Sequence, residues 1–503
     1  MFESRQSVQV LVMNTLAFTV CFAVWMMNGA LVTFLVEHDV FKWTGTQIGW
    51  LIGIPVLTGS LIRLPLGVLT DKYGGRVIFF WLMVLSAIPT YLLGRADSFH
   101  DFLLASLGFG FAGGSFAVGI AYTSVWFGKA RQGTALGIFG VGNMGAGVTS
   151  VAAPFLLRKL TAGGTNLEAW RQMPKIYAMG LLAMALIFWL FTYTRKTENG
   201  SLMGLGERLE PLKHVRVWRF GLYYFLVFGG FVALSQWLIP YYVNVYLLPV
   251  TMAGLMAAFF SFPGSVVRAL GGWMSDHWGA RRIMYWVLGA CTVCCLLLIV
   301  PRMQVTLPGK GVMAAKSGTV TAVTGGEIQV DAARYALRGE PETAVNLSQG
   351  FLVWPKRVFW HEAAVQPGEK VQRRQLLARG ISVIYFQANL WIFTVLVFVM
   401  GFAMGIGKAA VYRHIPDYFP NAVGVVGGMV GVLGGLGGFV CPIIFGYFLE
   451  RTGIWTSCWM LLAGLAVVCL VWMHWVIQKM MRKKAPVLMR QMESDYAVVH
   501  GEA

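Results

Sequence analysis

Charged residues are scarce in this sequence of 503 residues, since Asp, Glu, Lys and Arg make up only 12% of it while 57% of the side chains are hydrophobic. A soluble globular domain carries about 25% charged residues. The composition therefore excludes a soluble enzyme and a disordered chain, and it predicts a polytopic membrane protein. The net charge of +18 does not indicate a nucleic-acid partner, because the basic residues separate long neutral stretches instead of forming a stripe.

Cysteine is also scarce, with seven residues in the whole chain. All seven fall within predicted membrane spans, so a disulfide scaffold is excluded. Cys291 and Cys294 have the spacing of a redox or metal pair, but on an apolar helix they are read as packing residues. We expect no catalytic centre, no cofactor and no metal site.

Long charge-free runs are abundant instead. A helix needs about 20 mostly apolar residues to cross a bilayer, and such runs recur from end to end. The run 220–267 is too long for one helix and is divided between Pro240 and Pro249, which brings the predicted number of spans to twelve. With both termini in the cytoplasm, 19 Lys and Arg residues lie in cytoplasmic segments and seven in short outer loops, as the positive-inside rule requires.

Two internal repeats predict the architecture. The segment from Arg63 to Arg76 returns from Arg268 to Arg281 at an offset of 205 residues, with Arg, Gly, Asp, Gly and Arg aligned. Gly110-Phe-Ala returns as Gly401-Phe-Ala at an offset of 291. Two six-helix halves of the same orientation are the design of major facilitator transporters. The fold class expected is therefore an all-α polytopic membrane protein with a twelve-helix major facilitator fold.

The two offsets differ by 86 residues, which predicts an insertion between helices 9 and 10, on the periplasmic side. The predicted parts are an N-terminal six-helix bundle (1–194), a cytoplasmic linker (195–219), a C-terminal six-helix bundle (220–301 and 380–478), the insert (302–379) and a cytoplasmic tail (479–503).

The insert reads as β-structure, with strands expected at 317–323, 327–331 and 335–338. The segment 365–378 resembles the second half of a lipoyl/biotinyl-type barrel-sandwich hybrid, and Ser317-Gly-Thr-Val resembles its opening strand. No lysine occupies the Met-Lys-Met setting of that family, so no covalent cofactor is expected. The insert is interpreted as a small β domain that adds stability or docks an unknown partner; His361-Glu362 alone does not make it an enzyme.

Arg63 and Arg268 carry the strongest functional signal. Each lies eight residues before its aspartate, about 12 Å deeper in the membrane at 1.5 Å per residue, and so near the midplane. An arginine at that depth costs about 2.5–3.5 kcal/mol on insertion scales and cannot release its proton. None of the 22 acidic residues falls within a predicted core span, which leaves the substrate as the counterion. Two such guanidinium groups, each able to donate two parallel hydrogen bonds (a fork), suit a small planar anion. The alternative is that the two arginines donate to helix carbonyls in the core.

The aspartate repeat predicts a gate. Asp71 and Asp276 close the second and eighth spans, and the surrounding Gly-x-x-x-Asp-x-x-Gly-x-Arg resembles the loop signature of the facilitator superfamily. That resemblance implies a latch in which each aspartate pairs with neighbouring helix ends and with its arginine, Arg76 or Arg281. The alternative is ordinary capping of two helix ends.

Two glycine-rich segments identify a family. The stretch from Ala112 to Gly147 resembles the first signature region of the nitrate/nitrite porters (NarK-type) of the major facilitator superfamily, and Gly424–Phe439 resembles the second. The resemblance covers essentially all of the chain except the insert. It implies nitrate and nitrite as substrates and a bacterial inner-membrane location. It also implies a substrate site whose members are Arg63, Arg268, Phe116, Tyr224, Phe228 and Asn143.

Lys408 bears on the coupling mode. Moving one anion against a negative interior costs about 2.3 kcal/mol per 100 mV, so uptake must be coupled. No Asp, Glu or His lies at midplane depth, which supports exchange of nitrate for nitrite. Lys408, roughly 10 Å along the tenth span from Gly401, departs from the asparagine pattern of many family members, and a buried amine can release its proton. It favours proton-coupled import, unless it extends to the cytoplasmic interface. Export of another small anion is the more distant alternative.

Overall fold

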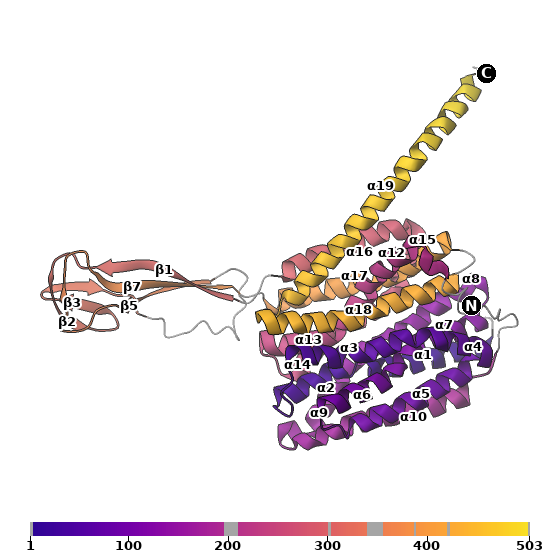
Figure 1. Cartoon of the computed structure of the whole chain (residues 1–503), viewed down its shortest axis with the longest axis horizontal. Coiled ribbons are helices and arrows are strands. Elements are labelled where there is room, and N and C mark those ends of the chain that lie inside the picture. Colours follow the sequence, from indigo (N-terminus) through magenta and orange to yellow (C-terminus); the bar gives the residue numbers. More distant parts are fainter. Residues whose placement is uncertain are drawn as a thin grey trace. The chain divides into compact units, whose positions relative to one another are not determined.

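The computed structural model describes residues 4–195, 210–299, 303–339, 356–386, 389–419 and 423–500. These residues form two compact units. The helical unit comprises Met1–Asn244, Leu248–Ile299 and Thr394–Ala503, and the insert comprises Val245–Leu247 and Val300–Phe393. Figure 1 shows the helices of the first unit and the strands of the second.

The first half of the helical unit is built from ten α-helices, several of which are joined end to end. They are α1 Arg5–Trp25, α2 Asn28–Glu37, α3 Gly45–Leu61, α4 Arg63–Tyr73, α5 Gly75–Leu93, α6 Phe99–Phe109, α7 Ser115–Trp126, α8 Lys129–Gly140, α9 Gly145–Leu160 and α10 Gln172–Phe191. Two short 3₁₀ segments, η1 Gly110–Gly114 and η2 Val141–Met144, interrupt the fourth and fifth spans.

The second half has the same plan with longer helices at its end. Its helices are α12 Val215–Tyr224, α13 Phe231–Tyr246, α14 Val250–Val266, α15 Arg268–Trp278, α16 Ala280–Leu298, α17 Leu390–Tyr418, α18 Val423–Thr452 and α19 Ser457–His500. A π-helical segment, η6 Phe225–Gly230, lies between α12 and α13.

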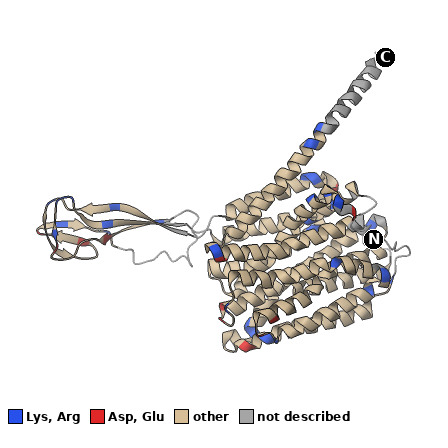
Figure 2. Cartoon of the chain, viewed as in Figure 1, with Lys and Arg blue, Asp and Glu red and all other residues tan. Residues whose placement is uncertain are grey.

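The prediction of twelve spans is confirmed. Among the described residues, eleven helices are long and apolar enough to cross a membrane, and the bent pair α14 and α15 makes the twelfth. The charged residues of this unit lie mostly near the ends of the helices (Figure 2). Large apolar side chains face outward on α5, where Trp81, Leu85 and Leu92 are 53%, 53% and 48% exposed. Such an apolar surface belongs against lipid.

The internal repeat is visible in how the helices touch. A Cβ atom at Gly59 would lie 2.7 Å from the carbonyl oxygen of Gly110, and a Cβ atom at Gly264 would lie 2.6 Å from that of Gly401. Gly264 and Gly401 are the positions that the offsets 205 and 291 assign to Gly59 and Gly110. Both halves therefore use the same close approach between the second and fourth span of the half, which only glycine allows.

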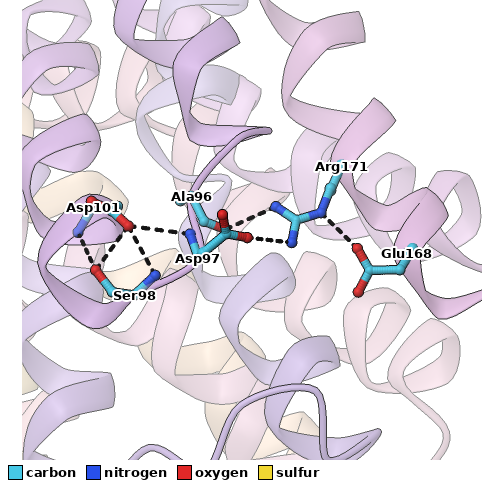
Figure 3. A network of polar contacts seen from close by, with 6 residues as sticks. All are labelled: Ala96, Asp97, Ser98, Asp101, Glu168 and Arg171. Atoms are coloured by element: carbon cyan, nitrogen blue, oxygen red, sulfur yellow. Dashed lines mark hydrogen bonds and ion pairs between the residues drawn. The ribbon is translucent and has the colours of Figure 1, made fainter.

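A polar network joins two loops at one end of the first half (Figure 3). Arg171 contacts the carboxylates of Asp97 and Glu168 at 2.6 and 2.7 Å and donates to the carbonyl oxygen of Ala96 at 2.9 Å. Ser98 and Asp101 form a capping box at the start of α6. The network fixes the loop after α5 against the start of α10.

The described residues of the insert form two antiparallel sheets. Its strands are β1 Met303–Met313, β2 Gly318–Val323, β3 Glu327–Val330, β4 Ala333–Ala336, β5 Lys356–Ala363, β6 Lys370–Val371 and β7 Leu376–Phe386. The strand orders are β1-β7-β5 and β4-β3-β2-β6. The predicted strands correspond to β2, β3 and β4. A core of its own, including Val320, Ile328, Val330 and Leu377, explains why the insert is compact.

Two predicted boundaries are wrong. The linker was expected to end at residue 219, but α12 begins at Val215; residues 196–209 of the linker lie outside the described residues. The insert was expected to end at residue 379 with a span beginning at 380, but β7 continues to Phe386 and α17 begins at Leu390. The residues directly after Gly380 are mostly apolar. Such a run fits a short buried strand as well as a helix, and hydropathy alone does not separate the two. The predicted tail from 479 begins within α19, which extends to His500.

Candidate functional site

Two helix breaks position the two arginines. The second span breaks after Leu61 and resumes at Arg63, and the eighth breaks after Val266 and resumes at Arg268. The second of these breaks bends the span by 45°. The breaks are 205 residues apart, as the repeat requires. Both arginines are buried, with 4% and 9% of their surface exposed, so both lie where their charge needs a partner.

The ring of Phe116 lies beside both guanidinium groups. The Cζ atoms of Arg63 and Arg268 are 5.3 and 5.2 Å from its centroid. Phe228 approaches Arg63 equally closely, at 5.3 Å, and its ring is 6.4 Å from that of Phe116. The structure thus brings together four of the predicted site residues, from both halves.

Three of the six guanidinium nitrogens of this arginine pair are buried without an acceptor. One nitrogen of Arg63, Nη1, donates to the carbonyl oxygen of Gly431 at 2.8 Å, so the alternative of bonds to helix carbonyls holds for this one group. Nε and Nη2 of Arg63 and Nη1 of Arg268 are buried without a hydrogen-bond partner. Among the side chains that the structure describes, neither arginine forms an ion pair. An unpaired buried charge is costly, which leaves a place for an anion.

Tyr224 places a hydroxyl in the same region. Its ring stacks on Phe228 at 4.9 Å with an interplanar angle of 4°. Its buried hydroxyl lies close to Tyr412 and Arg268 without a well-formed hydrogen bond. The π-helical segment η6 begins directly after Tyr224 and carries Phe228; such segments are frequent at functional sites.

Sequence reasoning missed Tyr412. Its ring lies 5.0 Å from that of Tyr224 and 5.9 Å from Cζ of Arg268, and its hydroxyl donates to the carbonyl oxygen of Gly427. Tyr412 follows Lys408 by four residues on α17 and so shares its helix face, a spacing that could have drawn attention to it. Trp25, with its ring 5.8 Å from Cζ of Arg63, was also missed.

Asn143 lies next to this group of residues without contacting an arginine through a hydrogen bond. It is fully buried on η2 and donates to the carbonyl oxygen of Gly140, while its Oδ1 has no partner. A Cβ atom at Gly140 would lie 3.2 Å from Cδ of Arg268, so the end of α8 packs against that side chain. The role of Asn143 as a substrate ligand stays a prediction.

Lys408 is buried and not interfacial. Its side chain is fully buried, its Nζ lies 3.3 Å from the centroid of the Phe231 ring, and it has no hydrogen-bond partner. The alternative in which this lysine extends to the interface is therefore wrong, because the neighbouring helices enclose α17 at this depth: Gly407, beside it, packs against Val227 and Val287.

The predicted gate differs from its expected pairing. Asp276 pairs with Arg413 of α17 at 2.6 Å, and Arg281 donates instead to the hydroxyl of Tyr418. The expected pairing of Asp276 with Arg281 is thus wrong. Arg413 and Tyr418, both near the end of α17, bind Asp276 and Arg281 respectively. In the first half, Arg76 donates to the carbonyl oxygen of Trp189; the side chain of Asp71 lies outside the described residues.

The two halves meet tightly at the opposite end from this gate. A Cβ atom at Gly49 of α3 would lie 2.3 Å from the carbonyl oxygen of Pro442 on α18. A Cβ atom at Gly254 of α14 would lie 2.1 Å from that of Ser150 on α9. Backbone approaches of this kind leave no room for a passage between α3 and α18 or between α9 and α14 at this end.

The arrangement agrees with a known family. The model of the Major Facilitator Superfamily matches residues 13–351 and 376–491. The chain belongs to this superfamily. Within it, the resemblance to NarK-type porters is confirmed: a protein of Thermus thermophilus named "Probable nitrate/nitrite antiporter NarK1" is 38% identical over 98% of this chain and 96% of its own length.

More distant relatives and solved structures extend the comparison. The "Nitrite extrusion protein" of Bacillus subtilis is 25% identical over 94% of this chain and 95% of its own. A bacterial homologue of the human lysosomal transporter Spinster, solved in an inward-facing and occupied conformation, has a TM-score of 0.62 at 14% identity, covering 95% and 98% of the two chains. The nucleoside transporter NupG has a TM-score of 0.58 at 13% identity, covering 94% and 98%. These structures support the fold alone.

Proposed function

We propose that the chain transports nitrate and nitrite across the bacterial cytoplasmic membrane by alternating access between its two halves. The observation that carries this proposal is the set of buried donors around Phe116 that lack an acceptor: Nε and Nη2 of Arg63, Nη1 of Arg268 and the hydroxyl of Tyr224. The names of the relatives from Thermus thermophilus and Bacillus subtilis support the same substrates.

The geometry suits a small planar anion. Guanidinium groups bind delocalised oxyanions through parallel N–H bonds, and here one fork comes from each half. Phe116 lies beside both guanidinium groups and Phe228 beside that of Arg63, and neither ring offers a competing acceptor. A bound anion would offset two like charges and connect the two halves through one ligand. Its release would restore the repulsion, which gives the anion a direct effect on the equilibrium between open and closed states.

The orientation follows from charge. The distribution of Lys and Arg supports a cytoplasmic location for both termini. The end with Gly49 would then face the periplasm and the end with Asp276 the cytoplasm. In this orientation the insert is periplasmic.

Proton symport is the favoured coupling mode, with Lys408 as the group that carries the proton. Lys408 is fully buried in the same half as Arg268 and has no hydrogen-bond partner. An amine can alternate between its charged and neutral forms, which a guanidinium cannot. A charged Lys408 would add to the positive field that attracts the anion, so proton and anion would enter together.

Nitrate/nitrite exchange is the second candidate. It is favoured by the lack of any Asp, Glu or His at the depth of the arginines within the described spans, and by the printed name of the Thermus thermophilus relative, an antiporter. Nitrate:proton symport and nitrate/nitrite exchange both move no net charge at one-to-one stoichiometry. The membrane potential therefore does not distinguish the two modes. A pH gradient and an internal anion do.

The test uses purified protein in lipid vesicles and measures nitrate entry in two arms. One arm has an acidic exterior and no internal nitrate or nitrite; the other has internal nitrite and equal pH on both sides. Symport predicts entry in the first arm, and entry confined to the second arm would establish exchange. Vesicles with Arg268→Gln are the control for leakage.

Substrate class is tested in the same vesicles. Nitrite should compete with labelled nitrate, whereas sulfate and lactate, which are not small planar monoanions, should compete poorly. If another small anion competes more strongly than nitrite, the alternative hypothesis, a facilitator that exports that anion, would be favoured over nitrate transport.

A further inference from the structure

Three arginines gather around two aromatic rings at the Asp276 end of the second half. Cζ of Arg216 lies 5.2 Å from the ring centroid of Tyr418, and Arg281 donates to the hydroxyl of the same tyrosine. Phe220 lies 5.7 Å from Tyr418, and Cζ of Arg219 is 5.4 Å from the Phe220 ring. The arginines come from two helices, α12 and α16, and are called the inner arginine cluster below.

No described carboxylate pairs with this cluster. The ion pair described in this half joins Asp276 to Arg413, and none of the described ion pairs involves Arg216, Arg219 or Arg281. Arg219 is only 8% exposed. Among the described side chains these three cations have no counterion, so they repel one another, and burial of one of them adds a desolvation cost. Orientation alone needs positive charge in loops and does not explain a buried arginine.

A second observation points to a ligand. The hydroxyl of Tyr223 is buried and has no hydrogen-bond partner, and Tyr223 itself is 2% exposed. It follows Arg219 by four residues on α12, so the two side chains lie on the same helix face. A buried hydroxyl without a partner costs free energy that a bound acceptor would recover.

We propose that the inner arginine cluster and Tyr223 form a second anion site, which binds one oxyanion. Guanidinium groups and hydroxyls are the donors that such an anion prefers. The anion is either a free one, such as nitrate or phosphate, which guanidinium groups bind, or the phosphate of an anionic lipid headgroup, which basic pockets between membrane helices bind. The site is separate from Arg63 and Arg268 and stands on its own contacts, whatever anion the central site transports.

The position of the inner arginine cluster next to the central site suggests what a bound anion would do there. Tyr223 directly precedes Tyr224, whose ring lies in the central site, so α12 connects the two. In the proposed orientation the cluster lies at the cytoplasmic end, where an imported anion leaves the protein. An occupied second site would also reduce the net positive charge of the cluster and stabilise the packing of α12 against α16 and α17.

The experiment uses the full chain with Arg63→Gln and Arg268→Gln, which silence the central site, in nanodiscs of neutral or anionic lipid. The thermal midpoint is measured against phosphate or nitrate at constant ionic strength. We expect the midpoint to rise with the anion. Addition of Arg219→Gln should weaken the apparent affinity about tenfold or more, as expected for a lost charge-assisted bond. Arg282→Gln, which removes an exposed charge next to the cluster, should leave it unchanged.

The two lipid arms identify the source of the anion. A rise with phosphate or nitrate in neutral discs assigns the site to a free oxyanion. A higher midpoint in anionic discs that Arg219→Gln abolishes assigns it to a lipid headgroup. Equal responses of Arg219→Gln and Arg282→Gln, or no response in either lipid, would overturn the proposal.

A conservative variant covers the case in which the arginine variants do not fold. Tyr223→Phe, in the otherwise unchanged chain, keeps the ring and all three charges and removes one hydroxyl. It should weaken the phosphate titration severalfold relative to the unchanged protein. An identical titration for Tyr223→Phe and the unchanged protein would count against the site.

Discussion

The two halves of the helical unit share a frame and differ in what they attach to it. Both break their second span at the same repeat position and resume it with an arginine, Arg63 or Arg268. Both hold the second and fourth spans together through a glycine contact, at Gly59 in one half and Gly264 in the other. The frame therefore places one fork on each side of the central site.

The difference appears on the fourth span of each half. At the offset of 291, Phe116 of the first half corresponds to Gly407, and Ala117 corresponds to Lys408. The first half thus supplies the ring that lies beside both arginines, and the second supplies a buried amine. Under the proposed function, anion binding would draw on both halves, while proton coupling would rest on the second half alone.

The largest effect is expected from the two arginines. Arg63→Gln and Arg268→Gln each remove a charged donor, worth about 1.5–3 kcal/mol per hydrogen bond, and two lost bonds should weaken nitrate uptake by more than about 100-fold. Arg63→Lys and Arg268→Lys keep the charge without the fork and should recover little. Initial rates of labelled nitrate uptake measure this.

Symmetry between the halves makes this prediction sharper. The uptake rates of the two Gln variants should fall by similar factors. Arg63→Gln should also lower thermal stability, because Arg63 donates a hydrogen bond to the carbonyl oxygen of Gly431 in the other half. Normal uptake by either variant would contradict the central site, and Arg282→Gln serves as the matched loss of an exposed charge.

The next effect concerns the shared frame. Gly59→Ala and Gly264→Ala would each place a methyl group against a backbone carbonyl oxygen, and overpacking of this kind costs about 1–3 kcal/mol. Gly67→Ala and Gly272→Ala are matched controls in the two halves, because a Cβ atom there meets nothing within 4 Å. Thermal unfolding in detergent should show lower midpoints for the first pair alone. A loss in only one half would show that the repeat is not structurally equivalent.

The frame could be predicted from the sequence, and part of the site could not. The repeat offsets locate Arg63 and Arg268 directly, because a buried arginine in an apolar run stands out in hydropathy. Tyr412 and the carbonyl of Gly431 reach the site only through the packing of α17 and α18 against other spans, which no local pattern specifies. The limit of β7 at Phe386 was missed for the related reason that pairing with β1 and β5, and not composition, decides where that strand ends.

A smaller and more selective effect is expected at Lys408. Lys408→Ala gives the second half the residue of the first and should lower uptake driven by a pH gradient about tenfold, while nitrate/nitrite exchange falls less. Lys408→Arg keeps a charge that cannot be released and should lose the same pH-driven component. Lys408→Ala should also raise the thermal midpoint, since it removes an unpaired buried amine. Full pH-driven uptake by both variants would assign proton coupling elsewhere.

The smallest effect is expected at the aspartate repeat. The side chains of Asp276 and Arg413 are 59% and 43% exposed, and exposed ion pairs contribute about 0–1 kcal/mol. Asp276→Asn should therefore slow uptake less than about fivefold, and high salt should reduce the difference further. The pair joins α15 to α17 within one half, so it holds that half together and does not latch the two halves to each other. Asp71→Asn tests the counterpart: a much larger loss there than at Asp276 would show that the gate is carried by one half alone.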